Sequence, residues 1–352
     1  MRKIYAGAAK PEAGGGGGGG SSTKYGATIS NFLGDVDANG VLQAPTWNMD
    51  LVFTGVKKVD SAIALSFPRR VTSNGSQPIA ATPIIRSVSF PDLEEVNGAG
   101  FEKSFENVGV ESISFPKLKY VRAGDGSNNY YAFGSTFSGG SYYYNGQYLG
   151  GITSISFPEL EEISGIYYAF NGTFNYNGNL TSISFPKLKK VERCSYRCFV
   201  SCPLTSVEFP ELQEVDEFIW FQSLKTLTSI SLPKLSKLGF SGLGNTNGGA
   251  FTGCSGLTTM TFPSLSDLTN AYYGLVKTFY NCTSLTSVSF PALKSTSFGT
   301  YTSQFNNMLS GCTGVTVHFP SNLQSVIGSW SDIIAGFGGT NTTVLFDLPA
   351  TE

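Results

Sequence analysis

A short pattern that recurs along most of the chain constrains the fold more than any other feature of the sequence. Ten segments end in an aromatic residue or leucine followed by proline, and successive prolines lie 23 to 42 residues apart. The ten pairs are Phe67-Pro68, Phe90-Pro91, Phe115-Pro116, Phe157-Pro158, Phe185-Pro186, Phe209-Pro210, Leu232-Pro233, Phe262-Pro263, Phe290-Pro291 and Phe319-Pro320. Repeats of this length are typical of solenoids, in which each coil packs on its neighbours. We therefore expect one elongated array rather than two globular domains.

The clearest copy of the repeat predicts the structure of one coil. Residues 180–191 read LTSISFPKLKKV, so Ile183 and Phe185 alternate with serines. This alternation is the periodicity of a strand with one apolar face and one polar face. Proline cannot donate a hydrogen bond to a ladder, so the strand should end there. Leu188 and Val191 form a second short apolar pair. The chain is expected to be a β-rich solenoid.

A loop motif repeats as well, and together the two motifs resemble a known family. The loops read FTGCSGL at 251–257, FYNCTSL at 279–285 and LSGCTGV at 309–315. The complete unit, Phe-x-x-Cys-x-x-Leu-Thr-Ser-Ile-x-Phe-Pro-x-Leu-x-x-Val, resembles the BspA-like leucine-rich repeats of bacterial surface proteins over about residues 63–320. The resemblance implies a right-handed leucine-rich-repeat array of about ten coils, with one short parallel strand per coil. It also implies adhesion to host proteins or cells. This chain differs in having Phe-Pro where many members have Ile-Pro, and in its variable coil lengths.

A glycine-rich segment separates the start of the chain from the repeats. Seven glycines at 14–20 are followed by two serines, which is the composition of a flexible tether. Residues 1–13 are then either a disordered tail or a peg that docks into a larger assembly, so 1–23 form a peg and tether. No apolar run of 7–15 residues follows the basic pair near the start, so no signal peptide is evident.

Two further segments flank the repeat region at 63–320. Residues 24–62 precede it and residues 321–352 follow it, and neither carries the repeat pattern. The terminal coils of a solenoid expose strand edges that invite association, so natural arrays cover them. We expect these segments to be an N-terminal cap and a C-terminal cap.

Composition excludes several classes of function. Only 14% of residues are charged, with 23 Lys and Arg against 25 Asp and Glu, so no basic surface for nucleic acid is expected. Hydrophobic residues at 41% are too many for a disordered chain. No run approaches 18 apolar residues, so no membrane span is expected. A single histidine leaves little room for acid–base catalysis or a histidine-rich metal site.

The charged residues after each proline alternate in sign along the chain. Arg69 and Arg70 begin a series that continues with Asp92, Glu94 and Glu95; Lys117 and Lys119; Glu159, Glu161 and Glu162; Lys187, Lys189 and Lys190; Glu211 and Glu214; Lys234 and Lys237; Asp267; and Lys294. Neighbouring parallel strands lie about 4.8 Å apart, so each acidic set should lie between two basic sets. The alternation favours one stacking order, and it makes these carboxylates ion-pair partners rather than a catalytic pair.

A tyrosine-rich insertion at 122–150 has the composition of a binding loop. Tyrosine supplies rigid amphipathic contact area, and the surrounding Gly, Ser and Asn supply adaptability. Together with a comparable loop in the next repeat, the candidate ligand-binding residues are Tyr130, Tyr131, Tyr142, Tyr143, Tyr144, Tyr148, Tyr167 and Tyr168. They form either a recognition patch or a stack of rings that fills irregular coils.

Serine and threonine form two rows on the polar face of the predicted strands. One row includes Ser154, Ser182 and Ser206, and the other includes Ser156 and Ser184. The rows are either a solvated polar surface or a flat hydroxyl surface that contacts a glycan or a protein.

Two patterns suggest metal ions. Residues 35–40, DVDANG, match the start of a calcium loop, with Asp35, Asp37 and Asn39 as ligands. The twelfth position is Thr46 rather than an acidic residue, and the Asn-Gly pair equally favours a hairpin turn. The six cysteines are Cys194, Cys198, Cys202, Cys254, Cys282 and Cys312, and they lack the paired knuckles of zinc sites. Four occupy equivalent repeat positions and are expected to be buried spacers. No cofactor is expected.

The sequence therefore predicts a binding or structural module that is not an enzyme. One interpretation is a virion-associated protein of a bacteriophage, such as a fibre or decoration protein, docked through residues 1–13. The alternative is a bacterial cell-surface adhesin that binds a host protein or glycan. The tether and the lack of an evident export signal favour the first. The expected location is a virion or a cell surface, and the ligand is not specified.

Overall fold

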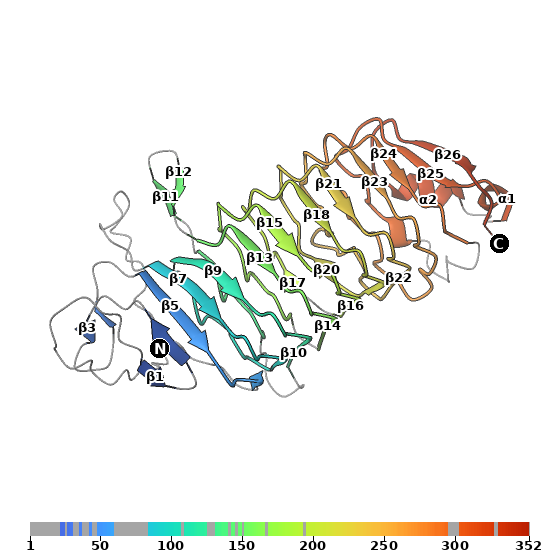
Figure 1. Ribbon diagram of the computed structural model, residues 1–352. Coiled ribbons are helices and arrows are strands. Elements are labelled where there is room, and N and C mark those ends of the chain that lie inside the picture. The colour runs from blue at the N-terminus through green and yellow to red at the C-terminus, as the bar shows by residue number, and fades with distance from the viewer. Residues whose placement is uncertain are drawn as a thin grey trace.

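The computed structural model describes residues 48–59, 84–106, 109–124, 131–139, 151–165, 168–192, 195–294, 303–326 and 330–351, and the backbone of short strands elsewhere. These residues form an elongated solenoid in which strands follow one another in sequence order, from β5 near one end to β26 at the other (Figure 1). The predicted peg at 1–13, the glycine run at 14–20 and the first motif, Phe67-Pro68, lie outside the described residues.

The first layer contains the strands that precede the prolines, together with β5, whose turn lacks a proline. They are β5 (Asn48–Phe53), β7 (Ile84–Ser89), β9 (Gly109–Ser114), β13 (Ser154–Ser156), β15 (Ser182–Ser184), β18 (Ser206–Glu208), β21 (Ser229–Ser231), β23 (Thr259–Thr261), β24 (Ser287–Ser289), β25 (Thr316–Pro320) and β26 (Thr343–Leu348). Neighbours pair in parallel in the groups β5-β7-β9, β13-β15, β18-β21 and β23-β24-β25-β26. The predicted β-rich array of short parallel strands is therefore confirmed.

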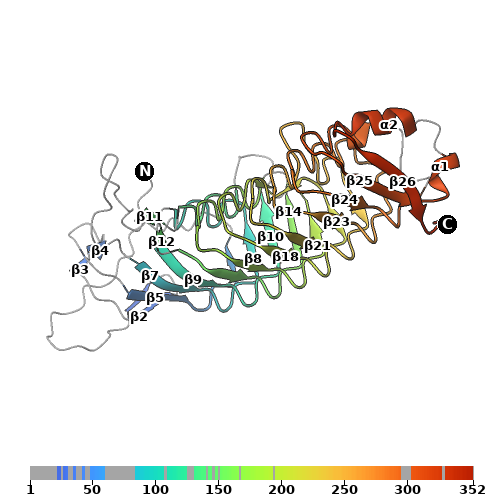
Figure 2. The same cartoon turned by 90° about the horizontal axis from the view of Figure 1, so that it is seen from above.

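A second layer of still shorter strands extends this prediction. The strands are β6 (Lys58–Val59), β8 (Glu95–Asn97), β10 (Tyr120–Ala123), β14 (Glu162–Gly165), β16 (Lys190–Val191), β19 (Glu214–Val215) and β22 (Lys237–Leu238). They form one seven-stranded sheet whose order follows the sequence. Several coils therefore carry two parallel strands, because the apolar pair after the proline is itself extended. The view from above separates the two layers (Figure 2).

The start of the array differs from the sequence expectation. The strand that pairs with β7 is β5, and Phe53 stacks on Phe90 with ring centroids 4.3 Å apart. Likewise β6 pairs with β8. Residues 48–53 and 58–59, within the segment predicted to be an N-terminal cap at 24–62, thus pair in parallel with solenoid strands. The Phe-Pro pattern does not mark this coil, because Thr54 and Gly55 replace the proline turn, with φ of +76° at the glycine.

Stacked phenylalanines form the core between the layers. Phe90, Phe115, Phe157, Phe185 and Phe209 are fully buried, and successive rings lie 5.1 to 5.6 Å apart. A parallel ladder on the loop side runs from Phe105 through Phe137, Phe174, Phe199, Phe221 and Phe251 to Phe279. Offset stacks of this kind add to the free energy of burying the rings. They also fix the register between neighbouring coils.

Each end of the array differs from the middle. At the N-terminal end, β1 (Ser22–Lys24) and β2 (Ala27–Ser30) add to β5 in antiparallel fashion. At the C-terminal end, α1 (Leu323–Val326) and α2 (Trp330–Gly336) flank β26, and the indole N–H of Trp330 donates to the Leu323 carbonyl at 2.8 Å. None of the described helices is long and apolar enough to cross a membrane.

Candidate functional site: the hydroxyl face

The outer side of the first layer presents two rows of hydroxyl side chains, which we call the hydroxyl face. Parallel pairing in register aligns each serine with its equivalent in the next coil, for example Ser182 with Ser154 and Ser229 with Ser206. One row is Ser87, Ser112, Ser154, Ser182, Ser206, Ser229, Thr259 and Ser287; the other is Ser89, Ser114, Ser156, Ser184, Glu208, Ser231, Thr261 and Ser289. All of these side chains are exposed or partly exposed. The alternation read from the sequence therefore places them on one surface.

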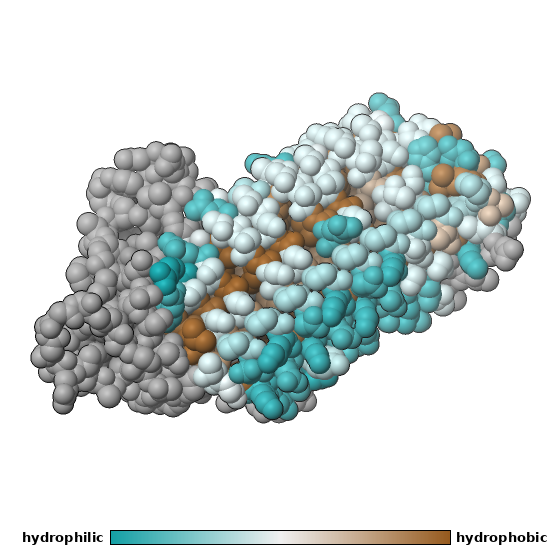
Figure 3. All heavy atoms as spheres, in the orientation of Figure 1, coloured by the Kyte–Doolittle hydropathy of each residue, from teal (hydrophilic) through white to brown (hydrophobic). Residues whose placement is uncertain are grey.

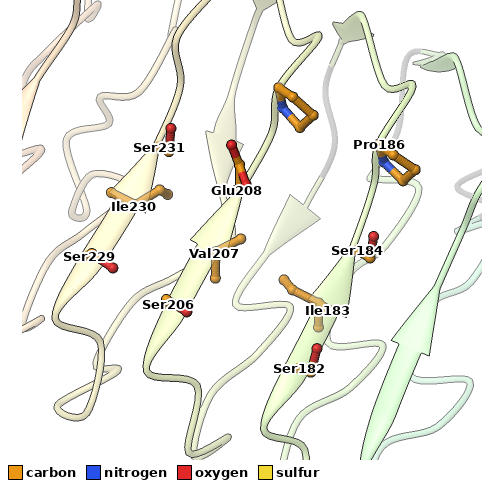
Figure 4. A pocket seen from close by; sticks show the side chains of 11 residues that line it. Ser182, Ile183, Ser184, Pro186, Ser206, Val207, Glu208, Ser229, Ile230 and Ser231 are labelled. Carbon is orange, nitrogen blue, oxygen red and sulfur yellow. The ribbon is translucent and has the colours of Figure 1, made fainter.

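A shallow groove runs across the hydroxyl face. It has a volume of about 590 Å³ and crosses β15, β18 and β21. Ile183, Val207 and Ile230 line it between the serines, as the close view shows (Figure 4). An adjoining hollow of about 270 Å³ continues along Thr259 and Thr261 of β23. The space-filling view shows an apolar stripe between paler polar bands over these strands (Figure 3). The groove thus offers aliphatic and hydroxyl contacts together.

The groove carries little charge. Glu208 is the single charged residue that lines it among the described side chains. Pro186 and Pro210 close one side, where the strands end. A ligand in the groove would meet hydroxyl groups, which can donate or accept hydrogen bonds, and branched aliphatic side chains. Such a lining suits a neutral or weakly polar surface better than a phosphate-rich one.

Beyond the prolines, the predicted alternation of charge is present as a ladder of ion pairs between coils. Lysine and carboxylate lie 2.6 to 2.9 Å apart in the pairs Lys117–Asp92, Lys187–Glu159, Lys189–Glu161, Lys234–Glu211 and Lys237–Glu214. At the start of the array Lys58 of β6 approaches Glu95 at 3.9 Å, and Arg69 and Arg70 lie outside the described residues. These side chains are half exposed, and each pair contributes little to stability by itself.

Hydrogen bonds in the ladder shift the pKa values of its carboxylates. The backbone N–H of Gly55 donates to Asp92 at 3.0 Å, and this bond, followed by Lys117, lowers the pKa of Asp92. The ammonium group of Lys189 lowers the pKa of Glu161, mainly through its hydrogen bond. Both shifts favour the charged form, as expected of carboxylates held in ion pairs.

The single histidine lies on the same face near the C-terminal end. His318 Nδ1 is 2.9 Å from a carboxylate oxygen of Asp347, and Ser289 is its register neighbour on β24. This order of serine, histidine and aspartate invites comparison with a hydrolase triad. However, no hydrogen bond joins Ser289 to the ring in the described structure, and the N–H of Phe290 is bonded to the His318 carbonyl. The N–H of Phe290 is therefore not available to an oxyanion there.

The predicted tyrosine site is described in part. Tyr131 and Tyr168 stack with ring centroids 6.4 Å apart, and the Tyr168 hydroxyl donates to Glu217 at 3.2 Å. Tyr142, Tyr143 and Tyr144 form β11 (Tyr142–Tyr144), which pairs in antiparallel fashion with β12 (Gln147–Leu149), where Tyr148 lies. Only the backbone of this hairpin is described. Tyr130 and Tyr167 lie outside the described residues.

A second aromatic cluster includes a residue that sequence reasoning missed. Phe240 stacks on Tyr272 at 5.4 Å and meets Tyr273 edge-on at 5.5 Å. Phe240 is 55% exposed, although most phenylalanines in the described coils are buried. Phe240 follows Gly239 and stands outside the Phe-Pro pattern, so the repeat did not indicate it. The cluster belongs to the loop side, away from the hydroxyl face.

The metal candidates have structural explanations in the described residues. Asp35 lies in β3 (Asp35–Val36), which pairs with β4 (Leu42–Gln43) in antiparallel fashion, as the hairpin interpretation requires. Asp37 and Asn39 lie outside the described residues. Cys198, Cys202, Cys254, Cys282 and Cys312 are buried and free, and no group of three or more potential ligands gathers among the residues searched. The side chain of Cys194 is not described.

Comparison with known proteins adds one positive finding. A scan against protein-family models matches residues 141–266 and 221–330 to the BspA type leucine-rich repeat region, with six copies. Together the matched ranges run from 141 to 330, more than half of the chain, and they include the strands that form the groove. Searches of the curated proteins and of the solved structures gave no match.

Proposed function

Because this chain belongs to the BspA-type leucine-rich repeat family, we propose that it is a non-enzymatic adhesive module that binds a protein receptor through the hydroxyl face. Proteins of this type are typically found at the surface or outside the cell. The observation that carries the proposal is the groove of about 590 Å³ across three strands, where small hydroxyl side chains flank a floor in which Ile230 is partly exposed and Ile183 and Val207 are 7% and 5% exposed.

The lining favours a protein over a glycan as the ligand in this groove. Ile183, Val207 and Ile230 are aliphatic, and no aromatic ring lines the groove among the described residues. Protein interfaces combine an apolar centre with polar groups at the rim, and the serine rows supply such a rim on both sides of the floor. A side chain of a receptor could bury apolar area there while its polar neighbours bond to the hydroxyl groups.

The test places bulk and charge in the groove without touching the core. Ser182 and Ser229 are exposed, so a variant with Ser182→Arg and Ser229→Arg should fold but block the groove. The matched control carries Thr283→Arg and Ser284→Arg, two exposed loop positions with the same added charge. Fluorescently labelled proteins are titrated onto bacterial cells and onto cultured epithelial cells.

Pretreatment of the cells separates the receptor classes. We expect the groove variant to bind at least about tenfold more weakly than the parent and the control, and protease treatment of the cells to abolish binding. Equal binding by all three proteins would exclude the groove. Binding that resists protease but is lost after periodate oxidation would show a glycan receptor and contradict the protein assignment.

The tyrosine-rich hairpin is a second candidate surface. Its composition is that of adaptable binding loops, and β11 and β12 hold four of the predicted tyrosines on one short hairpin. Replacing Tyr142, Tyr143 and Tyr144 with serine should weaken binding to the same cells with little change in melting temperature. A large loss of stability with unchanged binding would instead show that the rings fill the coils.

The finer proposal is that the protein is a fibre or decoration component of a phage virion. The peg at 1–13 and the seven glycines at 14–20 support it, since a docked peptide on a flexible tether suits attachment to a particle. A variant lacking residues 1–20 should fold but fail to co-sediment with phage particles from a lysed culture. Recovery of the parent protein on intact bacteria, and none on particles, would support the bacterial adhesin instead.

A further inference from the structure

The last described strand of the solenoid has no described strand on its outer edge. In the sheet β23-β24-β25-β26, β26 is the terminal strand and pairs with β25 alone among the described strands. Figures 1 and 2 both place β26 at the far end of the array, with no described strand beyond it. Six residues, Thr343–Leu348, make it as long as the longest strands of the first layer.

The hydrogen-bonding groups on that edge can be assigned from the pairing. The N–H of Thr343 donates to the Val315 carbonyl at 2.9 Å, so Thr343 directs its backbone groups toward β25. Backbone groups alternate sides along a strand, so those of Val344 and Phe346 point outward. An unpaired row of this kind is a template for another strand.

The edge also lacks the features that usually prevent association. Natural edge strands are blunted by lysine, proline or inward-pointing charge. In β26 the single charged residue is Asp347, which is already engaged by His318. Leu345 is 39% exposed, one of three large apolar side chains that are exposed in the described part of the chain. Val344 and Phe346 are partly buried against the core, as is Ile334 of α2.

The described residues that follow β26 do not cover the edge. Thr351 is held back toward the preceding coils, where its hydroxyl donates to the Leu293 carbonyl at 2.7 Å. The amide of Asn322 donates to the Thr351 carbonyl at 2.6 Å, which fixes the same segment. Residues 349–351 therefore run beside the array and not across its end.

We propose that β26 is a docking edge for a second copy of this chain, joined as an antiparallel two-fold dimer. In an antiparallel pair, residues whose backbone N–H and C=O groups point outward must lie opposite each other. This requirement places Val344 opposite Phe346 of the second copy, and Leu345 opposite Leu345 of the second copy. Thr343 then lies opposite the Asp347 of the second copy, where a hydroxyl can donate to the carboxylate. Each apolar side chain therefore lies opposite another apolar side chain, and the Thr343 hydroxyl donor lies opposite the Asp347 carboxylate acceptor.

This self-complementarity favours a second copy over an unrelated peptide. A peptide could satisfy the backbone groups, but the partly buried Val344, Phe346 and Ile334 would still need an apolar cover. The end of another array offers the same three side chains around the same edge. Two-fold contacts between identical patches also close on themselves, so they yield a dimer and no filament.

Cross-linking tests both the dimer and its register. Opposed residues of a non-hydrogen-bonded antiparallel pair have Cα atoms about 4.5 Å apart, within disulfide range, so Leu345→Cys should form a disulfide-linked dimer under mild oxidation. The matched control is Thr343→Cys on the same strand and face. The Cα atoms of residue 343 in the two copies would lie roughly 14 Å apart, beyond the limit of about 7 Å for a disulfide. Both proteins also carry Cys194→Ser.

Sedimentation tests the interface without a cross-link. We expect the parent to form dimers at micromolar concentration and Leu345→Lys to raise the dimer dissociation constant at least tenfold. Phe240→Lys is the control, because Phe240 is also exposed but lies away from the end. Circular dichroism shows that each variant is folded. A monomeric parent, equal cross-linking at 343 and 345, or an unchanged constant for Leu345→Lys would overturn the proposal.

Discussion

At the scale of single residues, the buried cysteines act as hydrogen-bond donors as well as spacers. Their thiols donate to phenylalanine carbonyls of the preceding coil, at 3.1 Å from Cys202, 2.9 Å from Cys254, 3.0 Å from Cys282 and 3.1 Å from Cys312. In an earlier coil the amide of Asn177 makes the equivalent bond to Phe137 at 2.7 Å. Leu224, which is buried and has no donor, occupies the equivalent position of another coil, so the side-chain bond adds a contact there and is not a requirement of the position.

The donor role predicts a difference between two substitutions at Cys282. Cys282→Ala removes the thiol bond to the Phe251 carbonyl, which keeps its bond from the Cys254 N–H at 3.0 Å, so the free energy of unfolding should fall by about 1 kcal/mol. Cys282→Ser keeps a donor and should lose less. The exposed Ser284→Ala is the control and should be neutral. Urea denaturation measures all three, and equal losses for alanine and serine would show that the thiol fills space and nothing more.

The same burial predicts unreactive thiols. Desolvation raises the pKa of Cys202 and of Cys254 to about 12, so at pH 8 both are almost entirely protonated. Since the thiolate is the nucleophile, iodoacetamide should not modify them in the folded protein and should modify them fully in urea. Peptide mass spectrometry reads each site separately. Rapid labelling of the native protein at either site would contradict the packing described above.

Asp92 predicts how stability depends on pH. Its pKa is lower in the folded protein than the ordinary 3.8, so the ionised carboxylate stabilises the fold at neutral pH. That stabilisation is complete well above 3.8 and is lost as the pH falls through the lowered value. The pKa of Glu161 is likewise lowered from 4.5. The unfolding free energy, measured with urea, should be flat from about pH 7 to 5.5 and fall below about pH 4, less steeply in Asp92→Asn.

At the scale of elements, the ion-pair ladder joins neighbouring coils in an alternating order. Reversing Lys187 and Lys189 to glutamate would place two acidic side chains beside Glu159 and Glu161. We expect a lower urea midpoint at low salt and a partial recovery at about 1 M salt, where the screening length is about 3 Å. Exchanging both partners, with Glu159→Lys and Glu161→Lys added, should restore part of the loss. An unchanged midpoint for the reversed variant would show that the pairs do not form in solution.

The elements also show what the sequence could and could not predict. Period-two alternation before each proline predicted the hydroxyl face and its strands, since a pleated strand sends alternate side chains to opposite faces. The strands of the second layer were not predicted, because a strand of two residues is too short to show an alternation of apolar and polar residues. The coil at β5 was missed because Gly55 replaces proline in its turn. The groove itself depends on packing across three coils, which no single repeat encodes.

At the scale of the whole molecule, each coil contacts its immediate neighbours, so damage should remain local. Phe209 is fully buried and stacks on Phe185 at 5.6 Å. Phe209→Ala should lower stability by about 3–5 kcal/mol through the lost ring and its cavity. Hydrogen exchange should accelerate in β15, β18 and β21 before it does in β24 and β25. Uniform acceleration along the array would show that the coils unfold as one unit instead.

The ladder of charge has a further consequence for how such an array can change in length over evolution. Removing one coil at the level of the gene would set two sets of like charge side by side, as would duplicating one coil. Removing or duplicating two successive coils keeps every lysine set next to a glutamate set, such as Lys187 beside Glu159 and Lys234 beside Glu211. A change in length by two coils therefore preserves the ladder, whereas a change by one coil, the structural repeat, does not.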